Sequence, residues 1–301
     1  MGVLSALRLQ AAQSQMSFRL LQPSVPFLHE LQRIRPIRRA VPIRGELAGR
    51  HCGTIQDKTM SKSAGIVIIG NEILSGKTQD TNSYFFCVEL RQLGVEVKKI
   101  STIPDDVELI GQEVIGFSKS FDYVFTSGGV GPTHDDVTIE GIAYGFGLKV
   151  VRHPDIEKRM RQRLGVDVNE ARLRMANVPE GAVLMATEAL FAPIIKIHNV
   201  FIFPGIPSIL QERFRTLREQ FRDTPYFLKI VFVRQGEGVI ASVMNDLLLR
   251  YPQLLLGSYP VIDVPDYKVK VTLESKDPEY LDRAVQSFLS SLPAGAVHRV
   301  Q

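Results

Sequence analysis

A glycine-rich loop flanked by hydroxyl side chains is the part of this sequence best suited to chemistry. It runs from Thr126 to Asp136 and holds three glycines. Glycines permit positive φ and close backbone approach, so successive N–H groups can face an anion. A helix predicted to begin just after the loop would add free N–H groups and a positive dipole end. We therefore predict a phosphate site formed by Ser127, Gly128, Gly129, Gly131, Thr133 and Thr138.

Two aspartates, Asp135 and Asp136, end this loop. Carboxylates beside an anion site would repel phosphate unless they also hold a cation. Magnesium takes one or two carboxylates and completes its shell with water and substrate phosphates. One of the two aspartates could instead cap the next helix, and both roles are compatible. The glycine pattern matches neither Walker A nor G-x-G-x-x-G, so by itself it also fits a tight turn.

A second loop, residues 71–82, carries two more acids, Glu72 and Asp80. Both loops follow predicted parallel strands, and ligands of such sheets bind outside the carboxyl ends of the strands. All four acids are therefore expected on one rim. We predict Asp80, Asp135 and Asp136 as catalytic residues, and Glu72, Asp135 and Asp136 as ligands of a divalent metal. Asp80 could also simply cap the next helix, and Glu72 could simply follow a strand.

The elements that would position these loops alternate along the chain. Strands predicted at 65–70, 95–103 and 121–126 alternate with helices at about 82–93 and 104–115. This order implies right-handed crossovers and a mostly parallel sheet between two helical layers. Residues 154–176 read as helical, 194–197 and 200–203 as two strands, and 207–221 as a last helix. The predicted fold class is therefore a three-layer α/β domain.

The last part of the chain has a different pattern. Strands predicted at 227–233, 255–259, 267–273 and 296–300, with helices at 238–251 and 277–292, follow the order β-α-β-β-α-β. That order is ferredoxin-like. We thus predict a targeting or disordered segment at 1–62, the α/β domain at 63–224 and a small α+β ferredoxin-like domain at 225–301. Because such units often serve assembly, we expect a homo-oligomer.

Charge and composition exclude several classes of function. Residues 1–60 carry a formal charge of +6 and the remainder −2, so the folded part is not basic overall. A general nucleic-acid surface, which needs clustered positive charge, is not expected. No run of 18 apolar residues occurs, and no membrane span is expected. The two cysteines lie far apart, which fits a reducing compartment.

The first 60 residues have the composition of a mitochondrial presequence. They contain eight arginines among leucine, alanine, serine and glutamine, with few acids. We therefore predict a mitochondrial protein. The alternative is a disordered tail, or a translation start at Met60 directly before the first strand, which would leave a cytoplasmic protein.

Two motifs together resemble the molybdopterin-binding (MoaB/Mog) domain superfamily. The first comprises residues 70–74, Gly76 and residues 80–82; the second comprises residues 127–133, the acidic pair and Thr138. The Gly-Pro-Thr form of the second motif, with residues 203–207, is similar to the CinA branch and to the N-terminal half of eukaryotic FAD synthases. Residues 257–260 and 267–273 resemble the FAD-synthase branch most closely.

The resemblance implies a molybdopterin-binding-like fold, a small ferredoxin-like domain, and hydrolysis of a nucleotide pyrophosphate such as FAD or ADP-ribose with Mg²⁺, Mn²⁺ or Co²⁺. The first motif usually has aspartate where this chain has Asn71. FAD synthases continue into an adenylyl-transferring domain beyond the position of Gln301, so we expect no FAD synthesis. Two other functions stay open: a non-catalytic nucleotide- or flavin-binding regulatory module, and pterin binding in molybdenum-cofactor biosynthesis.

Overall fold

The computed structural model describes residues 61–185 and 193–301 of the chain. The predicted targeting segment at 1–62 lies outside the described residues except for its last two positions. No helix in the described ranges is long and apolar enough to cross a membrane.

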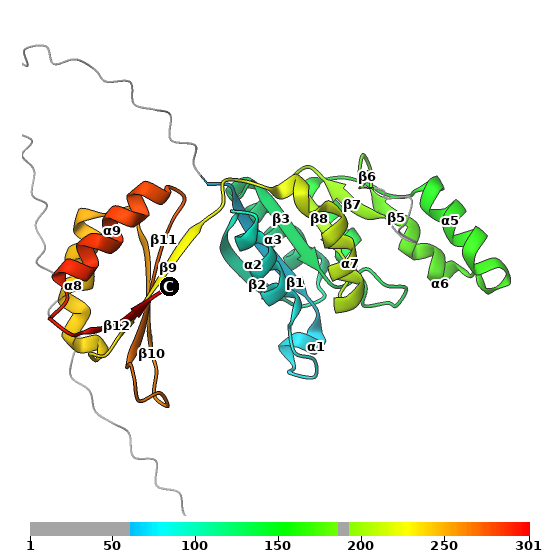
Figure 1. Cartoon of the computed structure of the whole chain (residues 1–301). Helices are drawn as coiled ribbons and strands as arrows, with labels where there is room; N and C mark the ends of the chain where they lie inside the picture. The colour runs from blue at the N-terminus through cyan, green and yellow to red at the C-terminus, as the bar shows by residue number, and fades with distance from the viewer. Residues whose placement is uncertain (1–60, 186–192) are drawn as a thin grey trace, which may run out of the picture. The chain divides into compact units, whose positions relative to one another are not determined.

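A six-stranded sheet forms the centre of the first domain (Figure 1), with the strand order β2-β1-β3-β8-β7-β6. Its first four strands are parallel, and β7 and β6 run antiparallel to their neighbours. The strands are β1 (Ser63–Ile69), β2 (Glu96–Ile103), β3 (Tyr123–Ser127), β6 (Val183–Met185), β7 (Ile194–Ile197) and β8 (Val200–Phe203). The predicted mostly parallel sheet is confirmed.

Helices cover both faces of this sheet, as a three-layer α/β fold requires. One face packs against α2 (Asn82–Gln92) and α7 (Pro207–Leu217), the other against α3 (Val107–Ser120) and α4 (Thr138–Phe146). The first core is aromatic: it is filled by the fully buried rings of Phe86, Phe125, Phe203, Phe214 and Phe221. Aliphatic side chains fill the second.

The region from 154 to 176 is not one helix, and the helical prediction for its whole length is wrong. α5 (Pro154–Leu164) ends at Gly165, whose φ of 54° a helix cannot continue. Two turns of 3-10 helix and the short α6 (Glu170–Leu173) follow. Two further strands that the sequence reading missed, β4 (Val150–Arg152) and β5 (Asn177–Pro179), pair antiparallel around this segment.

The second domain has the predicted order of elements. It consists of β9 (Phe227–Val233), α8 (Glu237–Arg250), β10 (Leu255–Pro260), β11 (Val269–Ser275), α9 (Pro278–Ser291) and β12 (Val297–Val300). Its antiparallel sheet has the strand order β10-β11-β9-β12, and both helices contribute to a single apolar core. The order and the antiparallel pairing are those of a ferredoxin-like unit.

Helices α3 and α4 of the first domain approach closely because glycines face each other. A Cβ at Gly111 of α3 would lie 2.9 Å from the carbonyl oxygen of Gly141 and 3.0 Å from the nitrogen of Gly145, both on α4. These neighbours are backbone atoms, which cannot turn aside as a side chain can. Gly116, one and a half turns further along α3, is exposed and has nothing within 4 Å of its ideal Cβ.

The two glycines of α3 predict opposite effects of the same substitution. Gly111→Ala should lower the free energy of unfolding of the domain by about 1–3 kcal/mol, the usual cost of overpacking. Gly116→Ala should raise it by up to about 1 kcal/mol, because alanine favours helix more than glycine. Urea denaturation followed by circular dichroism measures both. A Gly111→Ala variant as stable as the parent would show that the helices separate at little cost.

Candidate active site

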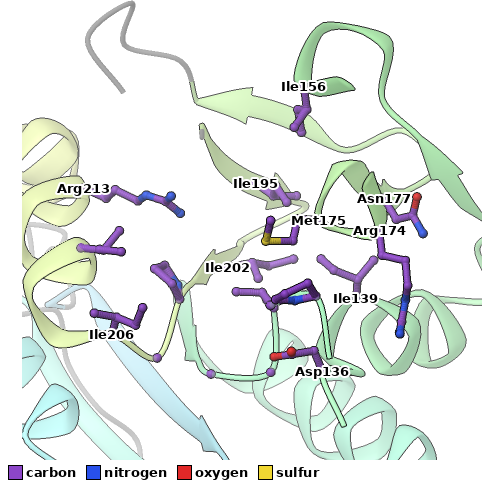
Figure 2. A pocket seen from close by; sticks show the side chains of 18 of the residues that line it. Asp136, Ile139, Ile156, Arg174, Met175, Asn177, Ile195, Ile202, Ile206 and Arg213 are labelled. Carbon is purple, nitrogen blue, oxygen red and sulfur yellow. The ribbon is translucent and has the colours of Figure 1, made fainter. Parts of the chain in front are cut away.

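Four segments meet at the carboxyl-terminal edge of the parallel strands. They follow β1, β2, β3 and β8 and begin at Gly70, Pro104, Gly128 and Pro204. A cavity of about 630 Å³ lies at this edge (Figure 2). Its volume lies within the usual range for small-molecule sites. The loops that follow β1 and β3 both lie at this edge, as the sequence predicts.

The glycine loop needs its glycines because of its backbone geometry. Gly128 has φ of 108° and Gly129 has φ of 61°, in the region that favours glycine. A Cβ at Gly128 would lie only 2.0 Å from the carbonyl oxygen of Ile69, and one at Gly129 would lie 2.4 Å from Oγ1 of Thr138. The Gly128 N–H donates to the carbonyl of Phe203 at 3.2 Å. The loop therefore packs closely against the ends of β1 and β8.

The N–H groups of Gly129, Val130 and Gly131 have no hydrogen-bond partner among residues 61–185 and 193–301. All three residues line the cavity. So do Ile139 and Glu140 in the first turn of α4, where helical N–H groups have no intrahelical partner. These groups form the donor surface that an anion requires.

The predicted hydroxyl donors are occupied within the protein. Thr138 is fully buried and its Oγ1 donates to the Gly128 carbonyl at 2.9 Å. Ser127 is also buried; its Oγ accepts from Asn82 and lies 3.3 Å from the Pro204 carbonyl. The Thr133 hydroxyl donates to the Asp136 carboxylate. These hydroxyls hold the loop in shape, while Gly129, Val130 and Gly131 present free N–H groups.

The buried amide of Asn82, which the sequence analysis placed only within the first family motif, ties three segments together. The Nδ2 group of Asn82, at the start of α2, donates to Ser127 Oγ at 3.0 Å and to the Gly205 carbonyl at 2.7 Å. Its Oδ1 is buried without a partner among the described residues. Asn82 also lines a second cavity of about 60 Å³, large enough to hold a water molecule. Asn82 therefore links the start of α2 to the segments that follow β3 and β8.

The acidic pair lies on the exposed side of the loop. Oδ2 of Asp136 accepts from the Thr133 N–H at 2.8 Å and from its hydroxyl, and Asp136 lines the cavity. The nearby Thr133 hydroxyl, and to a lesser degree His134, lower the pKa of the exposed Asp135. His134 itself is almost fully exposed, with its Nδ1 4.0 Å from Asp135. Asp136 is the member of the pair that faces the cavity.

Glu72 and Asp80 have different positions although they share a loop. Glu72 lies in the first turn of the short α1 (Asn71–Leu74) and lines the large cavity. Asp80 lines only the small one. Its Oδ1 accepts from the N–H groups of Asn82 and Ser83 at 2.9 and 3.0 Å, and its Oδ2 accepts from the Ser83 hydroxyl. The Asp80 carboxylate thus caps α2.

Asp105 is an acid that sequence reasoning missed. It follows β2, and its Oδ2 accepts from the Asn71 N–H at 2.8 Å. Burial raises the pKa of Asp105, and the negative charges of Glu72, Asp135 and Asp136 raise it further, against the opposing effect of the Asn71 N–H. Its place at the end of a parallel strand was the available signal, but residues 104–105 were read only as a helix start. The structure thus brings four carboxylates together on this rim.

These carboxylates do not enclose a metal ion by themselves. Within the described ranges, no three Asp, Glu, His or Cys side chains are arranged to hold one. A magnesium ion bound with a phosphate substrate needs only one or two carboxylates from the protein. The oxygen donors of Glu72 and Asp136 that line the cavity fit a cation that arrives together with its phosphate ligand.

Much of the cavity wall is apolar, and two arginines also lie on it. Apolar lining residues are Ile139, Ile156, Met160, Met175, Ile195 and Ile202. Arg174 is held by the Glu140 carboxylate at 3.5 Å and by the Thr133 carbonyl at 3.2 Å. Arg213 reaches into the cavity from α7 (Figure 2). The cavity therefore offers both a polar anion site and a surface for a flat or apolar group.

Comparison with known proteins identifies the family. Residues 65–223, more than half of the chain, match the family described as "Probable molybdopterin binding domain". The chain belongs to this family. Residues 225–301 match the family described as "FAD synthase, middle domain". The resemblance noted in the sequence is thereby confirmed.

Individual relatives give the same assignment. A protein of Archaeoglobus fulgidus is 37% identical over 74% of this chain and 95% of its own length. A probable FAD synthase of Caenorhabditis elegans is 34% identical over 78% of this chain, but that match spans only 51% of the synthase. The crystal structure of CinA from Thermoplasma acidophilum, described as of unknown function, superimposes with a TM-score of 0.50 at 29% identity. It covers 54% of this chain and 100% of CinA.

The raised pKa of Asp105 predicts a pH-dependent cost to stability. In the unfolded chain Asp105 ionises at its ordinary pKa, but in the folded protein it ionises at higher pH. Protonated Asp105 therefore makes its full contribution to the free energy of unfolding at pH values below the pKa it has in the unfolded chain. This contribution is lost as the pH rises through the pKa that Asp105 has in the folded protein. Asp105→Asn keeps an oxygen that can accept from Asn71 and removes the charge. We expect this variant to be more stable than the parent at pH 7.

The gain should shrink as the pH falls into the range where Asp105 of the parent becomes protonated. Denaturant unfolding at several pH values measures this. Asp106→Asn is the control, since Asp106 is exposed and asparagine can also cap α3; it should alter stability by less than about 0.5 kcal/mol. An Asp105→Asn variant that is less stable than the parent at pH 7 would contradict the inferred cost of a charged, partly buried Asp105 beside other acids.

Proposed function

We propose that this chain hydrolyses the pyrophosphate bond of a dinucleotide, FAD or ADP-ribose, in a reaction that requires a divalent metal. One observation carries the proposal: the free N–H groups of Gly129, Val130 and Gly131 line a cavity that Asp136 and Glu72 also line. Donors alone would suit any anion, and acids alone would suit any cation. Side by side, they suit a phosphate that binds with a metal ion.

The residues of the loop would bind and orient the phosphates. The N–H groups at 129–131 would donate to phosphate oxygens and stabilise the charge that develops on them during hydrolysis. Asp136, already oriented by Thr133, would face the bound pyrophosphate from the same loop. Asp105 lies behind the loop, with its Oδ1 3.5 Å from the position of a Cβ on Gly129, and its raised pKa would suit a carboxylate that accepts the proton of an attacking water.

The metal would be held by Glu72, Asp135 and Asp136 with the substrate's own oxygens. When bound, Mg²⁺, Mn²⁺ or Co²⁺ would polarise the phosphoryl group and neutralise part of its charge. Asp80 contributes to this site indirectly, through the cap that it forms on α2. Its predicted catalytic role is therefore proposed here as a positioning role.

The choice of a flavin or adenine dinucleotide rests on the relatives. The Caenorhabditis elegans relative is named a probable FAD synthase, and the second domain of this chain matches the middle domain of FAD synthases. The family description of the first domain names molybdopterin instead, which favours pterin binding as a second candidate. A flavin-binding regulatory module without turnover would use the same cavity.

One assay separates these functions. The purified chain is incubated with FAD, ADP-ribose or NAD in the presence of Mg²⁺, Mn²⁺ or Co²⁺, and the products are resolved by chromatography. Hydrolysis should yield two mononucleotides from FAD, or AMP and ribose phosphate from ADP-ribose, and chelation of the metal should stop it. Tight binding of FAD or of a pterin without any product would instead support one of the binding functions.

The acidic pair predicts how single substitutions alter this activity. Asp135→Asn and Asp136→Asn keep the shape of each side chain and remove one charge. At least one should lower turnover by about two orders of magnitude, the usual scale for loss of a charge-stabilising group. The larger loss is expected for Asp136, which lines the cavity. Initial rates over a range of metal concentrations measure this, and excess metal should restore part of the activity if the role is metal ligation.

Asp167→Asn is the matched control for these variants. Asp167 is exposed in the turn that follows α5 and does not line either cavity. Its substitution should leave the rate unchanged. If Asp135→Asn and Asp136→Asn hydrolyse the substrate as fast as this control, the pair has no part in the reaction, and the catalytic group must lie at Glu72 or Asp105.

A further inference from the structure

Arg213 is a charged side chain in the cavity to which the proposed hydrolysis assigns no part. It lies on α7, is half-buried, and lines the cavity. Its guanidinium has no hydrogen bond or ion pair within residues 61–185 and 193–301. Burial lowers the pKa of this arginine, and the neighbouring charge of Glu212 offsets the effect only in part. A half-buried guanidinium without a partner is costly unless a ligand supplies its acceptors.

The other arginine on the cavity wall differs in this respect. Arg174 has a carboxylate partner in Glu140 and a carbonyl partner in Thr133, so its charge is compensated within the protein. Arg213 has the same number of donors and none of these partners. The difference indicates that Arg213, rather than Arg174, is available to a bound molecule.

The position of Arg213 suggests which part of a ligand it meets. In Figure 2, Arg213 lies on the α7 side of the cavity and Asp136 on the side of the glycine loop, and Ile202 lies between them in this view. A phosphate at the glycine loop would therefore be separated from Arg213 by an apolar stretch. Flat aromatic rings pack well on such a surface, and the methionine sulfur adds a favourable contact with a ring. The ligand's ring would lie there, with its far edge toward Arg213.

A guanidinium selects a particular kind of edge. It carries five N–H donors and no acceptor, so it pairs with carbonyl or anionic oxygens and not with amino groups. The pyrimidine-dione part of an isoalloxazine ring presents two carbonyl oxygens at its edge. The adenine ring presents an amino group and ring nitrogens instead. The carbonyl oxygens of the flavin ring are better acceptors for this side chain than the ring nitrogens of adenine, two of which lie beside the amino donor. The chemistry of the ring edge therefore favours the flavin ring, although the apolar surface alone would accept both rings.

We propose that Arg213 selects the ring of the ligand: it donates hydrogen bonds to the carbonyl edge of a flat heterocycle of the flavin type, whose phosphate occupies the loop at Gly129–Gly131. This inference rests on the proposed function and narrows its substrate to the flavin dinucleotide. ADP-ribose, which lacks such a ring, uses the same phosphate site without the contact to Arg213.

The test measures binding of two mononucleotides to the full chain. FMN and AMP both carry one phosphate but differ in the ring. Isothermal titration calorimetry with Mg²⁺ present gives their dissociation constants for the parent, Arg213→Ala, Arg213→Lys and Arg215→Ala. Arg215 is the matched control, because it lies on the same helix, is exposed, and has its guanidinium 5.7 Å from the Phe85 ring instead of in the cavity.

Arg213→Ala should weaken FMN binding by about tenfold or more, the loss expected for a hydrogen bond to a charged group. AMP binding should stay as in the parent. Arg213→Lys should also weaken FMN binding, because lysine lacks the planar fork. Arg215→Ala should bind both nucleotides as the parent does. Thermal unfolding followed by circular dichroism checks that each variant is folded.

Two results would overturn the assignment. Equal weakening of FMN and AMP in a folded Arg213→Ala variant would show that Arg213 binds the shared phosphate and not the ring. Unchanged FMN binding would show that it contacts no ligand. Both outcomes are independent of turnover, so they are distinguishable from failure of the proposed hydrolysis, which appears as absence of product from FAD and ADP-ribose with the parent chain.

Discussion

The candidate site depends on how closely the ends of three parallel strands approach one another at Gly128. A side chain there would collide with the Ile69 carbonyl at the end of β1, and the Gly128 N–H bonds to Phe203 at the end of β8. This contact turns the chain sharply out of the sheet. As a result, the N–H groups of residues 129–131 have no partner in the described part of the chain, and these residues line the cavity.

The site that results contains two features that the described residues leave uncompensated. The N–H groups at 129–131 have no acceptor there, and burial together with the nearby charges of Glu72, Asp135 and Asp136 raises the pKa of Asp105. A phosphate bound together with a cation would compensate both, and the two features are therefore more informative together than apart. Clusters of this kind lower stability and persist where a ligand compensates for them.

Many of the polar side chains in the motifs serve the architecture rather than the ligand. Thr138 and Ser127 are buried and bonded to the loop backbone or to Asn82, and Asp80 caps α2. Their types and spacing look chemical in the sequence because a loop held by internal hydrogen bonds also needs hydroxyls and acids at defined positions. The groups left for a ligand are mainly backbone N–H groups, whose availability does not depend on side-chain type.

The sequence by itself determined the alternation of strands and helices, the glycine loop and the ferredoxin-like order of the second domain. These follow from local periodicity and from the backbone freedom of glycine, which need no knowledge of distant contacts. The helical prediction for 154–176 was wrong because Gly165 ends α5. β4 and β5 were missed because strands of three residues are too short to show a period.

Only the tertiary structure decided which side chains are free to bind. Asp105 joins the acidic group because β2 lies beside β1. Arg213 lines the cavity because α7 begins just beyond the end of β8 and packs on one face of the sheet. Hydrogen-bond partners and burial depend on contacts between residues far apart in the chain, and a single sequence does not contain that information.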